Sequence, residues 1–178
     1  MRGALQNHFV MVDPAISLEK DADYTAVVTV GMDQFQNIYV KNIVRKRMTP
    51  DELIKILFEL NEQYHPQEIA VEDVAYQKAL QYYITQEMNR KQIYLPITQV
   101  KPANRSKDQR IKGLQPLYSN GKIFHAKIVA NIQQLEDELL RFPRGKHDDV
   151  VDALSYALDI IYAPNRKVTR KNNKYLYR

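Results

Sequence analysis

Three apolar, β-branched runs in the first third of the chain restrict the possible folds more than any other feature. They are the segments 8–13 (HFVMVD), 24–33 (YTAVVTVGMD) and 37–47 (NIYVKNIVRKR). Strands that follow one another with only turns between them pair antiparallel. The sequence therefore predicts an antiparallel meander at the start of the domain.

The next segment, 49–64 (TPDELIKILFELNEQY), carries the signals of a helix start. Thr49 suits the N-cap, Pro50 the first helical position, and Glu52 completes a capping box. Apolar residues then recur at helical spacing, at Leu53, Ile56, Leu57, Leu60 and Tyr64. The run 68–73 (EIAVED) follows this helix, so it should pair parallel to an earlier strand through a right-handed crossover.

The rest of the chain continues the alternation. We predict a helix over 76–91, a strand over 93–100, helices over 106–121 and 126–142 with a short strand at 122–124 between them, and a last helix in 142–161 (FPRGKHDDVVDALSYALDII). The expected fold class is α/β, with a mixed central sheet of three antiparallel strands and then parallel strands, flanked by helices.

Length, composition and charge limit the possible functions. The 178 residues include no cysteine, so any metal must be held by carboxylates or histidines. No apolar run approaches the roughly 20 residues that span a bilayer, and no signal peptide is recognised, so we expect an intracellular protein without membrane contact. Residues 1–162 should form one domain. Residues 163–178 hold six Lys/Arg and no acid, and should form a basic, flexible tail.

Charge is divided unevenly inside the domain. Residues 90–146 carry 12 bases and 4 acids, whereas residues 147–162 carry four acids and no Lys or Arg. A basic middle beside acidic parts suits an enzyme that binds a polyanion next to a cluster of carboxylates. A solvated surface with a disordered tail would give the same pattern.

Acidic residues end two of the predicted strands and begin the last helix. Asp13 ends the first strand, Glu72 ends the fourth, and Asp148 and Asp149 open the final helix. If the first and fourth strands are parallel neighbours, Asp13 and Glu72 meet at the carboxyl edge of the sheet, where ligand sites gather. Clustered carboxylates without cysteine favour Mg²⁺ or Mn²⁺, and two such ions about 4 Å apart serve phosphodiester hydrolysis.

Each of these acids also has a structural explanation. Asp148 and Asp149 could cap the helix and complement its dipole. Asp13, followed by proline, could begin a turn. Asp152 could lie on a solvated face or support the metal ligands, and Asp73 replaces Glu72 if the strand register is shifted by one residue.

The segments VMVDPA, DADYTAVVTVG, IAVEDVAYQ, SKDQRI and FPRGKHDDVVDALSYAL, in this order over residues 8 to 162, resemble the C-terminal nuclease domain of the large terminase subunit of tailed bacteriophages. This resemblance implies a ribonuclease H-like fold and metal-dependent cutting of concatemeric viral DNA during genome packaging. It also implies double-stranded DNA, an ATPase domain, the small terminase subunit and the portal as partners, and the cytoplasm of the infected bacterial host as the location.

Carried over onto this sequence, the resemblance places the metal-binding acids at Asp13, Glu72 and the Asp148–Asp149 pair, with Asp149 favoured and Asp148 as an additional ligand. Asp23 is a lower-ranked ligand. Large terminases also contain an ATPase domain, but this sequence has no P-loop, so we predict an isolated nuclease domain that cuts without ATP.

DNA contact is expected from basic side chains in the middle of the chain. They are Lys101, Arg105, Lys107, Arg110, Lys112, Arg144, Lys146 and His147. They should bind phosphates rather than read bases. Two alternatives share these features: a ribonuclease H-like resolvase or integrase, and a non-catalytic module that binds DNA or the portal.

Overall fold

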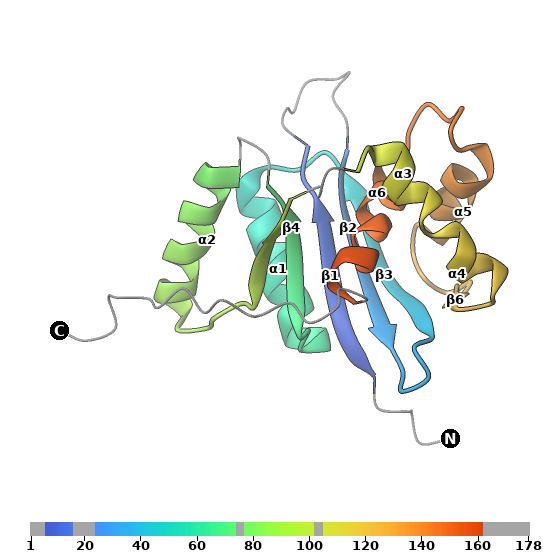
Figure 1. Cartoon of the computed structure of the whole chain (residues 1–178). Coiled ribbons are helices and arrows are strands. Elements are labelled where there is room, and N and C mark those ends of the chain that lie inside the picture. Colours follow the sequence, from blue (N-terminus) through green and yellow to red (C-terminus); the bar gives the residue numbers. More distant parts are fainter. Residues whose placement is uncertain (1–5, 16–23, 74–76, 102–104, 162–178) are drawn as a thin grey trace.

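The computed structural model describes residues 6–15, 24–73, 77–101 and 105–161, apart from the side chains of residues 77–79. Within these residues six strands form one mixed sheet in the order β5-β4-β1-β2-β3-β6 (Figure 1). They are β1 (Asn7–Asp13), β2 (Thr25–Met32), β3 (Ile38–Lys46), β4 (Glu68–Glu72), β5 (Ile97–Val100) and β6 (Ile123–Phe124). The first three pair antiparallel, and β4 pairs parallel with β1, which confirms the predicted mixed sheet.

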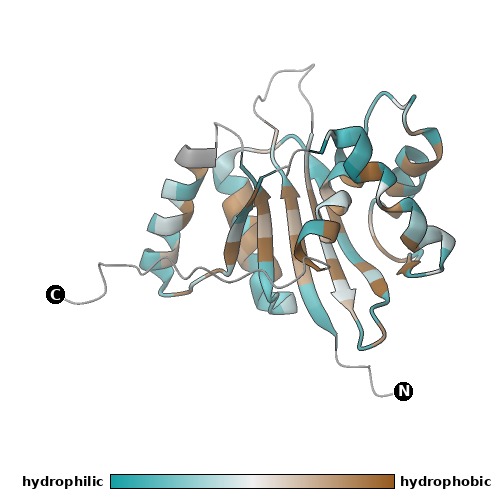
Figure 2. Ribbon diagram, in the orientation of Figure 1, coloured by the Kyte–Doolittle hydropathy of each residue, from teal (hydrophilic) through white to brown (hydrophobic). Residues whose placement is uncertain are grey.

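Helices cover both faces of this sheet. They are α1 (Pro50–Tyr64), α2 (Gln77–Lys91), α3 (Lys107–Lys112), α4 (Gln115–Ser119), α5 (Ile132–Arg141), α6 (Asp149–Ser155) and α7 (Ala157–Ile160). Apolar side chains of α1 and α2 pack on one face, and those of α3, α5 and α6 pack on the other. Figure 2 shows the apolar residues concentrated in the strands and on the helix surfaces turned toward them.

The alternation of side chains along β1 and β4 decides which face carries the acids. Val10 and Val12 point toward α1, whereas Met11 packs on the α6 side. Because side chains alternate along a strand, the Asp13 side chain lies on the same face as that of Met11. In β4, Val71 likewise packs toward α1, and Glu72 therefore lies on the α6 side. Val12 pairs with Val71 in the parallel register, which places the two acids side by side at the same edge and on the same face.

The start of α1 has the predicted capping box. The Thr49 hydroxyl accepts a hydrogen bond from the Glu52 N–H, while the Glu52 carboxylate accepts one from the Thr49 N–H. Pro50 occupies the first turn, where a backbone N–H would have no acceptor within the helix, so the proline costs no hydrogen bond. Both signals in the sequence are therefore confirmed.

Substitution of Thr49 by alanine is expected to destabilise the fold by about 1 kcal/mol, because the first turn of α1 loses a side-chain acceptor. The midpoint of urea unfolding measures the loss. A serine at the same position keeps the hydroxyl and should retain most of the stability. Equal losses for serine and alanine would show that the cap contributes nothing.

Several element boundaries differ from the prediction. The strand predicted over 93–100 begins only at Ile97, because Pro96 has no N–H for the ladder. The helix predicted over 106–121 is divided into α3 and α4 around Gly113. The helix predicted over 126–142 begins at Ile132, after Asn131 adopts a left-handed conformation with φ 61°.

Candidate active site

The predicted neighbours Asp13 and Glu72 lie together at the carboxyl ends of β1 and β4, and their side chains interact. The third acid beside them is Asp152 of α6. Burial, followed by the negative charges of Asp152 and Glu72, raises the pKa of Asp13 to about 8. Carboxylates crowded in this way repel one another and keep a proton unless a cation joins them.

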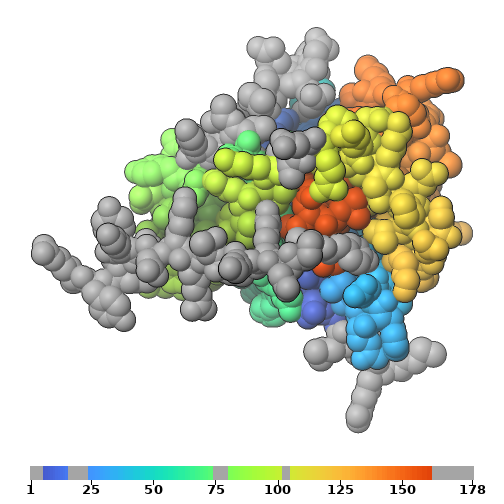
Figure 3. Space-filling model, viewed as in Figure 1, coloured from blue at the N-terminus to red at the C-terminus, as the bar shows by residue number. Residues whose placement is uncertain are grey.

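Helix α6 carries Asp152 to this position because the helix is enclosed on several sides. It contacts β1 and β2 of the sheet and also α3 and α5, and every residue from Asp149 to Ser155 is buried. In the space-filling view, α3 and α4 flank the atoms of the last two helices (Figure 3). Asp152 is only 4% exposed, so its charge needs partners inside the protein.

One of these partners is Lys107, at the start of α3. Its ammonium lies 2.7 Å from Asp148 Oδ1 and 3.3 Å from Asp152 Oδ2. Burial alone would lower the pKa of Lys107, but the hydrogen bond to Asp148 and the charges of Asp152, Asp148 and Asp13 raise it. Lys107 is therefore a cation held among the acids, with a side chain that is still 44% exposed.

Asp149, favoured from the sequence as the main ligand, faces a different neighbourhood. Its carboxylate accepts hydrogen bonds from Arg45 Nη2 at 2.8 Å and Nε at 3.2 Å. The Arg45 guanidinium stacks on the ring of Tyr24, 3.8 Å from its centroid, and His147 Nδ1 lies 4.0 Å from Asp149. The structure thus brings Asp152 and Asp148 to Lys107, while Asp149 is paired with β3.

Glu138 of α5 lies near Arg45, so that Arg45, Asp149 and Glu138 form a second cluster of charged side chains. Glu138 was not singled out from the sequence. One carboxylate oxygen accepts hydrogen bonds from the N–H groups of Val150 and Val151, each at 2.9 Å, and the other lies 3.5 Å from Arg45. Glu138 therefore caps the first turn of α6 from outside that helix. The sequence did contain a signal, because Glu138 lies three residues after Leu135 and therefore on the same side of the helix.

Arg110 of α3 is buried, although the sequence placed it among the DNA contacts. It is 4% exposed, and its Nη2 donates to Asp152 Oδ1 at 2.6 Å and to the Tyr156 hydroxyl at 3.1 Å. The guanidinium is thus unavailable to a DNA phosphate in this structure. The expectation of phosphate contact at Arg110 is corrected to an internal ion pair.

The other predicted DNA contacts remain at the surface. Lys101, Arg105, Lys107, Lys112, Arg144 and Lys146 are exposed, and His147 is partly buried. Several are ion-paired, Lys101 with Asp73 and Arg105 with Asp159. Asp23 and the tail 163–178 lie outside the described residues.

The donor set fits a hard divalent cation. Asp13, Glu72, Asp148 and Asp152 offer only oxygen. Burial and the charges of Asp152 and Glu72 raise the pKa of Asp13, and a bound cation would lower it again. In the conformation of the described residues, no three His, Asp or Glu side chains are arranged so as to hold an ion. The positive charge between Asp148 and Asp152 is supplied by Lys107.

No helix in the described part of the chain is long and apolar enough to span a membrane.

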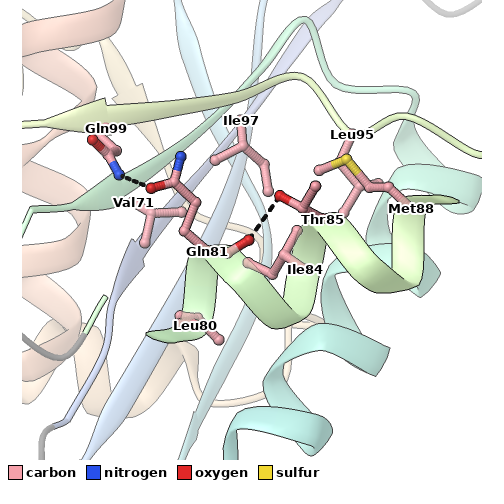
Figure 4. A pocket seen from close by; sticks show the side chains of 9 residues that line it. All are labelled: Val71, Leu80, Gln81, Ile84, Thr85, Met88, Leu95, Ile97 and Gln99. Atoms are coloured by element: carbon pink, nitrogen blue, oxygen red, sulfur yellow. Dashed lines mark hydrogen bonds between the residues drawn. The ribbon is translucent and has the colours of Figure 1, made fainter. Parts of the chain in front are cut away.

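A separate small cavity of about 170 Å³ lies on the opposite face of the sheet, between α2 and the strands β4 and β5 (Figure 4). Its lining includes Leu80, Ile84 and Met88 of α2 and Val71 of β4, and Gln99 donates to Gln81 at its rim. No acid lines it. The cavity therefore has no part in the carboxylate site.

A known protein family and several solved structures are similar to this chain. A sequence model of the family described as "Terminase RNaseH-like domain" matches residues 10–159. No curated protein sequence matches the chain. The solved structure of the fowlpox virus Holliday junction resolvase is similar, with a TM-score of 0.51 at 13% identity over 87% of this chain and 97% of that one.

Two further solved structures are similar at comparable identity. The fowlpox virus resolvase in complex with substrate Holliday junction DNA has a TM-score of 0.50 at 13% identity, over 87% of this chain and 95% of that one. RuvC of Thermus thermophilus has a TM-score of 0.46 at 12% identity, over 84% and 92% of the two chains.

Proposed function

This chain belongs to the family of terminase RNaseH-like domains, and from that membership we propose that it is a divalent-metal-dependent DNA endonuclease that cuts concatemeric viral DNA during genome packaging. The membership confirms the resemblance seen in the sequence, and the ribonuclease H-like fold is that predicted. Fold and family together support a nuclease. The substrate, the metal and the packaging partners are the further content of the proposal.

The observation that carries the proposal is the meeting of acids from three separate elements. Asp13, Glu72 and Asp152 come from β1, β4 and α6, and the charges of Glu72 and Asp152 act on Asp13. Asp152 is buried, and the other two acids are half-buried. Stability gives no reason for such a group, because buried like charges repel. We assign these three side chains as the principal metal ligands, with Asp148 as an additional ligand.

Asp149 has a different role in this proposal. Its carboxylate pairs with two nitrogens of Arg45 of β3. The carboxylates that act most strongly on Asp13 are those of Asp152 and Glu72. We therefore assign Asp149 to holding α6 against β3 rather than to binding the metal. The sequence favoured Asp149 over Asp148, and the contacts of the two side chains support the reverse order. Asp152, expected to support the ligands, becomes a ligand itself.

The bound metal ions would activate a water molecule and stabilise the leaving oxygen of the scissile phosphodiester. Asp13, Glu72 and Asp152 would hold these ions and fix the position of the phosphate. Lys107 has an exposed side chain and can turn from Asp148 and Asp152 toward a phosphate oxygen once other cations neutralise the acids. Its charge would then stabilise the negative charge that develops on the phosphate.

The basic surface beside the site would hold the duplex. Lys101, Arg105, Lys112, Arg144 and Lys146 are exposed, and contacts with phosphates bind DNA without reading its sequence. Binding should weaken steeply as salt concentration rises. In the complete packaging machine, in the cytoplasm of the infected bacterium, we expect the domain to work with an ATPase, the small terminase subunit and the portal.

Plasmid digestion tests the proposed function. With Mn²⁺ or Mg²⁺ the domain should convert supercoiled and linear plasmid to fragments without ATP, and EDTA should stop the reaction. Preference for a four-way junction over linear duplex would favour a resolvase instead. Salt-sensitive DNA binding without cutting in any metal would favour a binding module and overturn the enzyme assignment.

Metal binding should also stabilise the folded domain. A ligand that binds only the folded state at 100 times its dissociation constant contributes about 2.7 kcal/mol. We therefore expect Mn²⁺ to raise the midpoint of thermal unfolding, and Asp13→Asn to remove most of that increase. An equal rise in the wild type and in Asp13→Asn would place the binding site elsewhere.

A further inference from the structure

Arg110 is a buried cation directly behind the proposed metal ligands. Its side chain is 5% exposed and that of Asp152 is 6% exposed, and one guanidinium nitrogen lies 2.6 Å from the Asp152 carboxylate. The same nitrogen donates to the Tyr156 hydroxyl at 3.1 Å. The guanidinium also lies over the Tyr156 ring, 4.7 Å from its centroid. Two side chains, one from α3 and one from the end of α6, thus form a single unit.

This unit contacts both sides of the site. The Tyr156 hydroxyl interacts with Glu72 of β4. The negative charges of Asp152 and Glu72 both stabilise the charged guanidinium of Arg110. The Tyr156 hydroxyl accepts a hydrogen bond from Arg110, and its own proton remains for donation to Glu72. The unit therefore connects an acid of the sheet with an acid of the helix.

Neither side chain reaches the protein surface. Tyr156 is 1% exposed, and within the described residues Arg110 Nε has no hydrogen-bond partner. A buried guanidinium with a free N–H beside carboxylates can orient them without binding a phosphate. The approach of α3 to the last helices is close, because a Cβ added at Gly113 would lie 2.7 Å from Leu158 Cδ1.

We propose that Arg110 and Tyr156 are positioning residues, which hold Asp152 and Glu72 in the orientation that binds the divalent cation. The inference rests on the proposed function and adds the groups that set metal affinity. Partners behind metal ligands typically change metal affinity by about 10 to 100-fold when they are replaced. Arg110 would hold the Asp152 carboxylate directly and would act on Glu72 through the Tyr156 hydroxyl.

The test measures Mn²⁺ binding directly, from the electron paramagnetic resonance signal of free Mn²⁺, without DNA. Tyr156→Phe keeps the ring and removes only the hydroxyl, and Arg110→Lys keeps the charge and removes the planar fork. We expect the dissociation constant to rise about tenfold or more for Arg110→Lys, and by a smaller factor for Tyr156→Phe. At saturating Mn²⁺, the cutting rate of Tyr156→Phe should return to nearly that of the wild type.

The matched control is Arg90→Lys, an exposed arginine of α2 paired with Glu87 outside the site. It should leave Mn²⁺ affinity unchanged. If Tyr156→Phe and Arg110→Lys lower the unfolding midpoint but leave the Mn²⁺ affinity unchanged, both residues contribute only to packing and the inference is overturned. A wild type that binds Mn²⁺ but cuts no DNA would defeat the proposed function and leave the positioning test valid. A wild type that binds no Mn²⁺ would defeat both.

Discussion

Replacing Asp152 with asparagine is expected to slow plasmid cutting at a fixed Mn²⁺ concentration by about a thousandfold or more. The physical reason is the loss of a buried carboxylate that faces Asp13, since metal-assisted stabilisation contributes several kcal/mol to the transition state. Asp149→Asn should lose less than about tenfold in rate, because its carboxylate pairs with Arg45 rather than with the group around Asp13. Initial rates of supercoil loss measure both variants.

Asp13→Asn separates lost chemistry from lost folding. Burial and the charges of Asp152 and Glu72 raise the pKa of Asp13 to about 8, so a neutral side chain there should leave the fold as stable as before or more stable. Cutting should nevertheless fall as far as in Asp152→Asn. If Asp149→Asn remains folded and loses activity as completely as Asp13→Asn, the ligand set must include Asp149 after all.

The second large effect concerns stability and is expected at Glu138. Alanine at this position leaves two buried N–H groups at the start of α6 without their acceptor, and it leaves Arg45 with one acidic partner fewer. Breaking a buried pair by removing one member costs about 3–5 kcal/mol. We expect a loss in that range from urea unfolding analysed by linear extrapolation.

Two further variants define what Glu138 contributes. Glutamine keeps an acceptor oxygen and loses the charge, so it should lose about 1–2 kcal/mol. Asp137→Ala, at an exposed position on the same helix, should change stability by less than about 0.5 kcal/mol. A loss in Glu138→Ala no larger than that in Asp137→Ala would show that α6 does not depend on this cap.

The sequence was sufficient where local chemistry decides the outcome. The capping box at Thr49 and Glu52, the three antiparallel strands, and the parallel pairing of β4 with β1 all follow from patterns within short segments. The placement of Asp13 beside Glu72 follows from that pairing and from the right-handed crossover. The meeting of these two acids at the edge of the sheet could therefore be predicted.

The orientation of α6 could not be predicted in the same way. Successive residues of a helix turn by about 100°, so adjacent acids face different partners. The helix sequence DVVDALS gives no exposed face from which to fix the rotation, because every residue of α6 is buried. Arg45 and Arg110 decide which acid turns where, and they come from β3 and α3, far away in the sequence.

The order of the acids along the chain has a consequence for synthesis. Asp13 and Glu72 belong to the first half of the sequence, whereas Asp152 stands on a helix near its end, and the sheet must exist before α6 can pack on it. A chain still emerging from the ribosome therefore carries two of the proposed ligands and lacks the third. On this assignment, a chain cannot cut DNA before α6 has been synthesised and has packed on the sheet.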